Sequence, residues 1–145
     1  MKGFDGGKKI SGVKRHIAVD IMGNVLMVIV TAASMGEREG LKLLLEQMCI
    51  QFYKLVKIMV DGGYSGAEVA LWVKKCFDWT LEVVNKLIGQ VGFKVLPKRW
   101  VVERTFGWLS RYRALSKDYE YHYQNSESMV YLVMIHLNLR RLSSA

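Results

Sequence analysis

The sequence predicts an α/β domain that occupies residues 1–145, with the element order β-β-α-β-α-β-α-α. Polar and apolar residues alternate from Lys14 to Ile21, which indicates a half-buried strand, whereas leucines recur at helical spacing after Glu37. A chain of 145 residues, 51% of them hydrophobic, is long enough for one domain with a buried core.

The first two strands are predicted to form an antiparallel hairpin. Gly23-Asn24 is a two-residue turn signal between the strand over 14–21 and a second strand, Val25–Thr31. That second strand is apolar throughout, which predicts a central place in the sheet. Ser34 and Glu37 then stand at capping-box spacing, before an amphipathic helix over 37–50.

Strands and helices alternate in the rest of the chain. A strand over 55–60 leads to Asp61, and the next helix, opened by Ser65-Gly66, has a predicted buried face of Val69, Trp72, Val73 and Cys76. Further along, the pattern predicts a strand over 80–84, a loop over 86–92 and an extended stretch over 93–96 before Pro97. The last part of the chain is predicted to contain a helix over 100–112, an irregular region over 113–125, and a helix over 127–142 capped by Ser126.

The amino-acid composition indicates which class of partner to expect. Lys and Arg total 21 against 13 Asp and Glu, so the formal charge is +8 and favours a polyanion: nucleic acid first, an anionic membrane surface second. Cys49 and Cys76 lie in apolar, helix-like stretches and are predicted to be buried free thiols, as expected in the reducing cytoplasm. The start lacks the apolar core of a signal peptide, and no apolar run approaches the ~20 residues that span a bilayer, so we expect a soluble protein with no membrane partner.

Asp61 is the first candidate site residue. It follows a predicted strand directly and precedes Gly62-Gly63, and the carboxyl edges of strands commonly hold ligands in α/β folds. Glycines there would let a metal or a large substrate approach the backbone. An Asx turn, in which Asp61 binds nearby amides, explains the same residues without any function.

Glu103 is the second candidate. Within the predicted helix, Val102, Phe106 and Leu109 form the expected core stripe, and a neighbouring stripe carries Arg99, Glu103, Gly107 and Arg111 at four-residue intervals. The second stripe indicates either a metal-binding carboxylate between phosphate-binding arginines, with Gly107 leaving space, or an exposed helix with ordinary ion pairs.

Five segments, in order, resemble the DDE transposases of insertion sequences, in the insertion-sequence-five group. They are 4–10 with 14–17, the hairpin end Thr31-Ala32-Ala33, Val60-Asp61-Gly62-Gly63-Tyr64, the stretch 96–109 around Glu103, and 113–120. The resemblance implies a ribonuclease-H-like mixed sheet with flanking helices. It also implies that Asp61 and Glu103 are the second and third catalytic acids and bind Mg²⁺ (or Mn²⁺), with Arg99 four residues before Glu103.

The resemblance also shows two departures. The family's usual basic residue after the glutamate falls at Ser110, beside Arg111. The first strand, which should carry the first acid ahead of the loop over 3–12, is missing, and Asp5 and Asp20 do not stand where that acid belongs. The chain then resembles either a downstream reading frame, joined to its first half by frameshifting, or a truncated copy.

The implied reaction is phosphoryl transfer on DNA ends, in which three carboxylates hold two metal ions roughly 3.5–4 Å apart. The residues expected to bind DNA are Lys98, Arg99, Arg104, Arg111, Arg113 and Lys117. Tyrosines between 112 and 123 either stack on bases or pack within a loop. With one acid missing, we expect the chain alone to be inactive and to pair with itself or with an upstream half. A DNA-binding fragment that modulates a complete transposase, and an unrelated α/β binding domain, are the alternatives.

Overall fold

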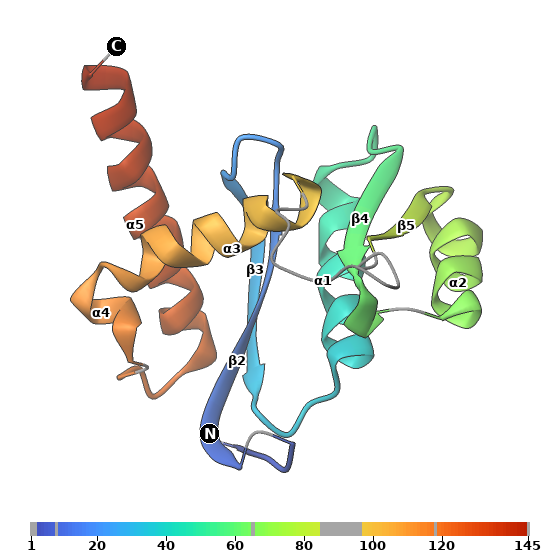
Figure 1. Ribbon diagram of the computed structural model, residues 1–145, viewed down its shortest axis with the longest axis horizontal. Helices are drawn as coiled ribbons and strands as arrows, with labels where there is room; N and C mark the ends of the chain where they lie inside the picture. The colour runs from blue at the N-terminus through green and yellow to red at the C-terminus, as the bar shows by residue number, and fades with distance from the viewer. Residues whose placement is uncertain (1–2, 8, 65, 85–96, 118, 145) are drawn as a thin grey trace, which may run out of the picture.

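A computed structural model describes residues 3–7, 9–64, 66–84, 97–117 and 119–144. Figure 1 shows a central twisted hairpin with α1, β4, β5 and α2 to one side, α4 and α5 to the other, and α3 crossing in front of the strands. The strands are β1 (Gly3–Asp5), β2 (Ile10–Val19), β3 (Val25–Ala32), β4 (Lys57–Asp61) and β5 (Thr80–Val84). The helices are α1 (Glu37–Gln51), the 3-10 turn η1 (Gly62–Tyr64), α2 (Ala67–Phe77), α3 (Pro97–Ser110), α4 (Arg113–Ser116) and α5 (Tyr123–Ser143).

The predicted hairpin is confirmed. β2 and β3 pair antiparallel, with a register shift between Ala18 and Val19 just before the turn. Gly23 has φ +86°, a backbone conformation that favours glycine. Asp20 organises the turn, because its carboxylate accepts hydrogen bonds from the amides of Met22 and Asn24, at 2.8 and 2.9 Å.

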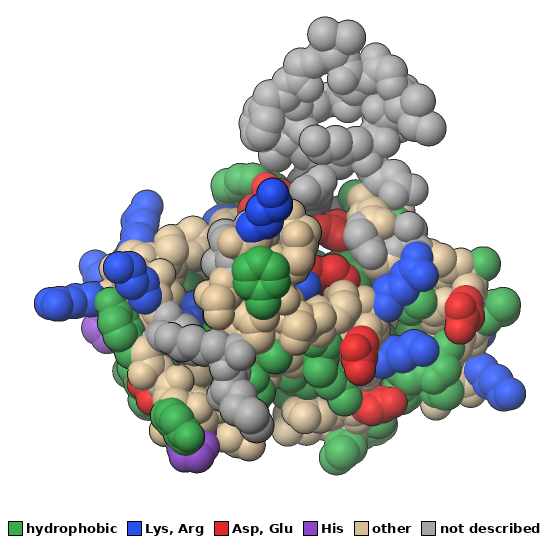
Figure 2. All heavy atoms as spheres, turned by 90° about the horizontal axis from the view of Figure 1, so that it is seen from below, with side chains coloured by type: hydrophobic (Ala, Val, Ile, Leu, Met, Phe, Trp, Pro, Cys, Tyr) green, Lys and Arg blue, Asp and Glu red, His purple; other side chains and the backbone are tan. Residues whose placement is uncertain are grey.

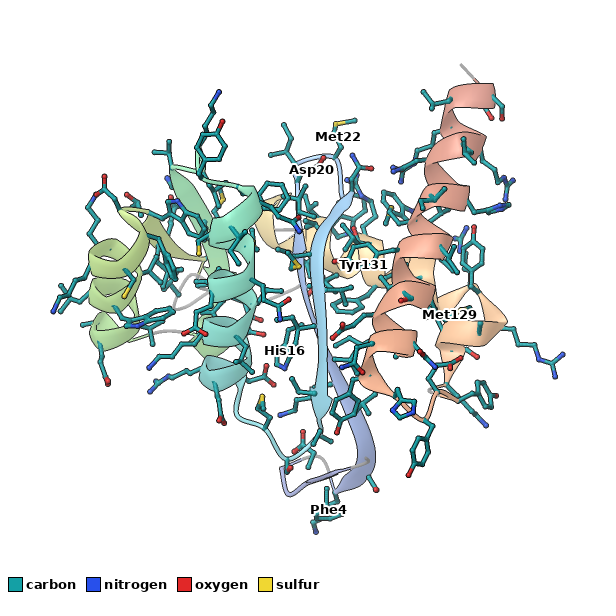
Figure 3. All side chains as sticks on the ribbon, turned by 180° about the vertical axis from the view of Figure 1, so that it is seen from behind. Phe4, His16, Asp20, Met22, Met129 and Tyr131 are labelled. Carbon is teal, nitrogen blue, oxygen red and sulfur yellow. The ribbon has the colours of Figure 1, made fainter. Side chains whose placement is uncertain are left out.

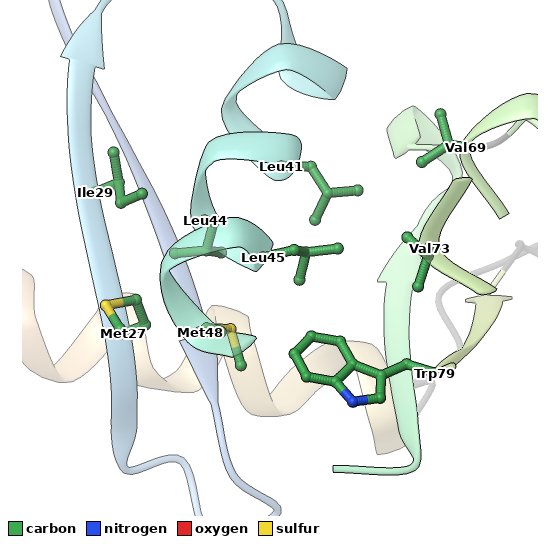
Figure 4. Close-up of a cluster of buried hydrophobic side chains, with 9 residues drawn as sticks. All are labelled: Met27, Ile29, Leu41, Leu44, Leu45, Met48, Val69, Val73 and Trp79. Atoms are coloured by element: carbon green, nitrogen blue, oxygen red, sulfur yellow. The ribbon is translucent and has the colours of Figure 1, made fainter. Parts of the chain in front are cut away.

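The described strands form two separate sheets. One contains β1, β2 and β3, and the other is the parallel pair of β4 and β5. Two clusters of buried side chains hold the helices to them. The larger cluster joins Met27 and Ile29 of β3 to α1, to α2 and to Trp79 (Figure 4). The second joins Val28, on the opposite face of β3, to α3, α4 and α5. The mixed α/β character predicted from the sequence is therefore confirmed.

The predicted central position of the strand at 25–32 is wrong for the described sheet. The backbone amide of Val28 donates to the hydroxyl of Tyr131, and that of Val30 donates to Oε1 of Glu127, at 3.2 and 2.8 Å. Helix α5 therefore covers the outer edge of β3, and Figure 3 shows Tyr131 between the two elements. The strand is apolar on both faces because α1 packs on one face and α3, α4 and α5 pack on the other.

Several local predictions are also corrected. The N-cap of α1 is Gly36, so Ser34 caps nothing there, and α5 begins at Tyr123, which leaves Ser126 buried within the helix. Part of the region predicted to be irregular is therefore helical, in α4 and in the start of α5. Capping motifs are local signals, and in the structure neither Ser34 nor Ser126 stands at the N-cap of a helix.

Two expected core positions are exposed. Cys76 lies at the surface, and Phe106 is 38% exposed, whereas Thr105 is fully buried and donates a hydrogen bond to the carbonyl of Gly23 at 2.8 Å. The buried face of α3 thus runs through Thr105 and Leu109, because the helix must contact the hairpin turn as well as α5. The loop and extended stretch predicted over 86–96 lie outside the described residues.

His16 is a core residue with a hydrogen bond to Thr31, whose hydroxyl lies 3.1 Å from Nε2. Burial lowers the pKa of His16 below 6.5, although the nearby Glu37 carboxylate opposes this shift. The unfolded chain therefore binds the proton more tightly than the folded chain. Stability should be complete above about pH 6.5 and should fall as the pH drops below it.

Urea unfolding at about pH 7.5 and about pH 5 checks this expectation, because the midpoint should fall at the lower pH and the fall should be smaller in His16→Gln. The exposed His136 provides the control, since His136→Gln should keep the pH dependence of the original chain. A fall of the same size in His16→Gln would assign it to other groups.

Candidate active site and nucleic-acid interface

Asp61 is the last residue of β4, and η1 follows it directly. β4 pairs in parallel with β5, and Asp61 lies opposite Val84 at the carboxyl end of both strands. β4 is only partly buried, and Ile58 and Val60 are its residues that pack against the larger core cluster. The structure thus places the half-buried Asp61 at the sheet edge that the sequence predicts.

Tyr64, at the end of η1, connects this turn to α1. Its hydroxyl donates to Oε2 of Glu37 at 3.0 Å. Burial raises the pKa of Tyr64 above its ordinary value, with further increases from the Glu37 charge, from the hydrogen bond to Glu37 and from the Asp61 charge. The phenol therefore stays protonated and donates to Glu37, while the Asp61 carboxylate lies close enough to affect it.

Glu37 in turn joins the turn at 61–64 to the amino-terminal strands. Nζ of Lys14 lies 3.5 Å from Oε1 of Glu37 and 3.4 Å from Oδ2 of Asp5, and it donates to the carbonyl of Met35 at 2.9 Å. A polar network therefore links β1, β2, α1 and η1, the turn that directly follows Asp61. Nothing in the sequence spacing indicated this network, because its members are brought together only by the fold.

Glu103 lies on the exposed side of α3, and α3 packs against both β2 and β4. The helix that carries the second candidate acid thus contacts the strand that carries the first. Gly107, one turn further on, has no atom within 4 Å of the position of an added Cβ, as expected if it leaves space beside Glu103. Asp61 and Glu103 each have interactions within the chain.

Arg104 fixes α3 to the hairpin turn. Its guanidinium carbon lies 4.8 Å from the ring centres of both Trp100 and Trp108, and Nη2 donates to the carbonyl of Met22 at 3.0 Å. Arg141 of α5 covers Trp108 at 4.2 Å. Trp100, Arg104 and Trp108 follow each other at four-residue intervals, so the sequence contained the signal for this stack.

The predicted DNA-binding residues therefore fall into three groups. The side chains of Lys98 and Arg99 lie outside the described part of the structure. Arg104 is engaged with its own chain, whereas Arg111, Arg113 and Lys117 are exposed near the junction of α3 and α4. On the face shown in Figure 2, Lys and Arg side chains project at both ends, with acidic side chains among them.

The described residues do not bring together the three acids of the expected metal centre. Among the described residues, no group of three or more His, Cys, Asp or Glu side chains is arranged to hold a metal ion. The described residues thus do not fit a complete metal centre of three acids, and Asp61 and Glu103 are its only predicted members. Over the same part of the chain, no helix is long and apolar enough to cross a membrane.

Comparison with known protein families gives a match over most of the chain. The family model described as "Transposase DDE domain" matches residues 1–139, which is nearly the whole chain. No curated protein and no solved structure matches the chain. The match covers both elements that hold the candidate acids, β4 and α3.

Proposed function

Because the chain belongs to the family of transposase DDE domains, we propose that it is a C-terminal part of a transposase of the insertion-sequence-five group, acting in DNA transposition by phosphoryl transfer on DNA ends. The observation that carries this proposal is the family match over 1–139, which includes both Asp61 and Glu103. The contact between α3 and β4 supports it, because two catalytic acids of one site require adjacent elements.

DNA is the proposed partner, in the cytoplasm of the cell. The formal charge of +8 favours a polyanion, and the exposed Arg111, Arg113 and Lys117 supply cations next to the helix that carries Glu103. Lys98 and Arg99 belong to the same proposed surface. A second copy of the chain, or an upstream half of the transposase, is the proposed protein partner.

The purified 145-residue chain should bind DNA without cutting it. Two carboxylates, Asp61 and Glu103, are one fewer than the reaction needs, and among the described residues no group of three acids is arranged to hold a metal ion. A gel-shift assay and a cleavage assay on the same DNA, with Mg²⁺ and then with Mn²⁺, test both halves of this expectation. Cleavage by the chain alone would contradict the prediction that it lacks an acid that the reaction needs. Absence of DNA binding would contradict the proposal that DNA is its partner.

Removal of single exposed cations should weaken DNA binding evenly across sequences. Each of Arg111→Gln, Arg113→Gln and Lys117→Gln should reduce the slope of log affinity against log salt by about one, because each removes about one phosphate contact. Lys75→Gln is the matched control, since Lys75 is exposed on α2, a helix that packs against β5. An equal reduction for Lys75→Gln would show that the charge as a whole, and not this surface, binds DNA.

A non-catalytic DNA-binding role is the second candidate, favoured by the incomplete set of acids. Such a fragment would lower the cleavage rate of a complete transposase when the two are mixed. The two roles are separated by mixing the complete transposase with the Asp61→Asn chain instead of with the original chain. The variant should inhibit equally if the fragment only occupies DNA, and only the original chain should support cleavage if it contributes its acids.

A further inference from the structure

The outer face of α5 carries a row of exposed apolar side chains. The row consists of Leu132, Ile135, Leu139 and Leu142. Each of these side chains is between 56% and 75% exposed, although Leu and Ile are among the residues most often buried. Because they follow each other at intervals of three, four and three residues, they lie on one side of the helix and form a continuous stripe, which we call the outer stripe.

The inner face of the same helix is apolar as well. Val130, Val133 and Met134 lie on the opposite side of α5 from the outer stripe and are buried in the second core cluster. A surface helix with one covered face has one apolar stripe and a polar face toward water, whereas α5 has two apolar stripes that point in opposite directions. The inner stripe holds α5 to its own domain, so the outer stripe is available for a second contact.

We propose that the outer stripe is a dimer interface, against which α5 of a second copy of this chain packs in the antiparallel direction. Intervals of three and four residues are the heptad spacing at which the side chains of one helix fit between those of a facing helix. A two-fold axis at the level of Leu137 places Leu132 of one copy against Leu142 of the other. The same axis places Ile135 against Leu139, so the outer stripe is complementary to itself.

Charge favours the antiparallel direction over the parallel one. Arg140 and Arg141 are exposed in the last turn of α5, and the helix has no acidic residue after Glu127. A parallel pair would bring the four guanidinium groups of two copies to the same end, in a chain whose formal charge is already +8. An antiparallel pair separates them to opposite ends and also sets the two helix dipoles in opposite directions.

The size of the contact predicts a weak and reversible dimer. The part of α5 from Ser128 to Leu142 is about 20 Å long and about 10 Å wide with its side chains. Two copies therefore cover on the order of 1,000 Å² in total, which is at the lower limit for specific interfaces. Because β3, α3 and α4 already hold α5 in place, association does not have to order the helix, and we expect a dissociation constant on the order of 10 μM.

The second copy is the protein partner put forward with the proposed function, but this contact needs neither DNA, nor a metal ion, nor a catalytic acid. Sedimentation velocity of the complete chain without DNA, from about 1 to about 300 μM, therefore tests the interface separately from the reaction. The chain should pass from monomer to dimer over this range and should stop at the dimer, because a two-fold contact closes on itself.

A substitution in the outer stripe tests whether this face forms the dimer. Leu139→Lys places a charge opposite Ile135 of the second copy and should raise the dissociation constant at least about tenfold. Leu71→Lys is the matched control, since Leu71 is also an exposed leucine within a helix, on α2, and the dimer should be unaffected. Both side chains are exposed in the monomer, and circular dichroism of each variant checks that it folds.

Disulfide cross-linking tests the direction of the two helices. In a chain with Cys49→Ser and Cys76→Ser, the two free thiols are removed. An equal mixture of chains that carry Leu132→Cys and Leu142→Cys should then cross-link at least about tenfold faster than either chain alone, because only an antiparallel pair brings these two positions together.

Four results would overturn the proposal. The first is a monomer throughout the concentration range. The second is an equal loss of the dimer in Leu71→Lys and in Leu139→Lys. The third is rapid cross-linking of the Leu142→Cys chain by itself, which would indicate a parallel pair. The fourth is a monomer that binds vesicles of anionic phospholipid and loses this binding in Leu139→Lys, which would assign the outer stripe to a membrane surface.

Discussion

Replacing Gly40 with alanine should lower the free energy of unfolding by about 3 kcal/mol. A Cβ at this position would overlap three atoms of the His16 ring. That ring is only 4% exposed and is held by Thr31, so it has no free space into which to move. Helix α1 would have to move away from β2, which would open the larger core cluster.

Gly107→Ala is the matched control for this substitution. Gly107 also lies within a helix, but nothing approaches the position of its added Cβ within 4 Å. Alanine there should raise the free energy of unfolding by up to about 1 kcal/mol, because it favours the helix. Urea unfolding of both variants measures the difference, and equal effects would contradict the close approach of α1 to β2.

Neutralising either candidate acid should reduce DNA cleavage by more than about 100-fold in a complete, active transposase that contains this chain, since even indirect supports of metal ligands contribute about 10- to 100-fold. Asp61→Asn and Glu103→Gln keep the shape of each side chain and remove the charge. DNA binding should be unchanged or slightly tighter, because a negative charge near the phosphates is lost. Cleavage rates and gel shifts on one substrate separate the two effects.

The control for charge is Glu68→Gln, an equally conservative change in the first turn of α2, on an exposed side chain. It should leave cleavage unchanged. Full activity of Glu103→Gln would mean that the third acid is elsewhere in the chain, and full activity of Asp61→Asn would leave the turn after β4 with the purely structural role of an Asx turn.

Local patterns predicted the elements that have a clear periodicity or a clear turn signal. The hairpin turn at Gly23, the helix from Glu37 and the strand Thr80–Val84 were all readable from periodicity and turn residues. Helix α5 was placed correctly but started too late, because Ser126 is a good capping residue by itself yet is buried against β3 in the structure. Tertiary packing decided where that helix begins.

The candidate site was likewise predictable from the sequence only in part. The positions of Asp61 at a strand end and Glu103 on a helix followed from sequence. The contacts of Tyr64, Glu37 and Lys14 did not, because residues separated by more than 20 positions meet only after folding. The stack of Trp100, Arg104 and Trp108 lies between these cases: its spacing was visible, but its role depends on the hairpin turn that it holds.

The cover that α5 places over β3 has a consequence for aggregation. Fibrils and other runaway β-assemblies grow because each added strand exposes a new edge for the next. At β3 the outward amides of Val28 and Val30 are already occupied by Tyr131 and Glu127, which opposes the addition of a further strand in that direction. Polymerisation through the hairpin would therefore end at β3.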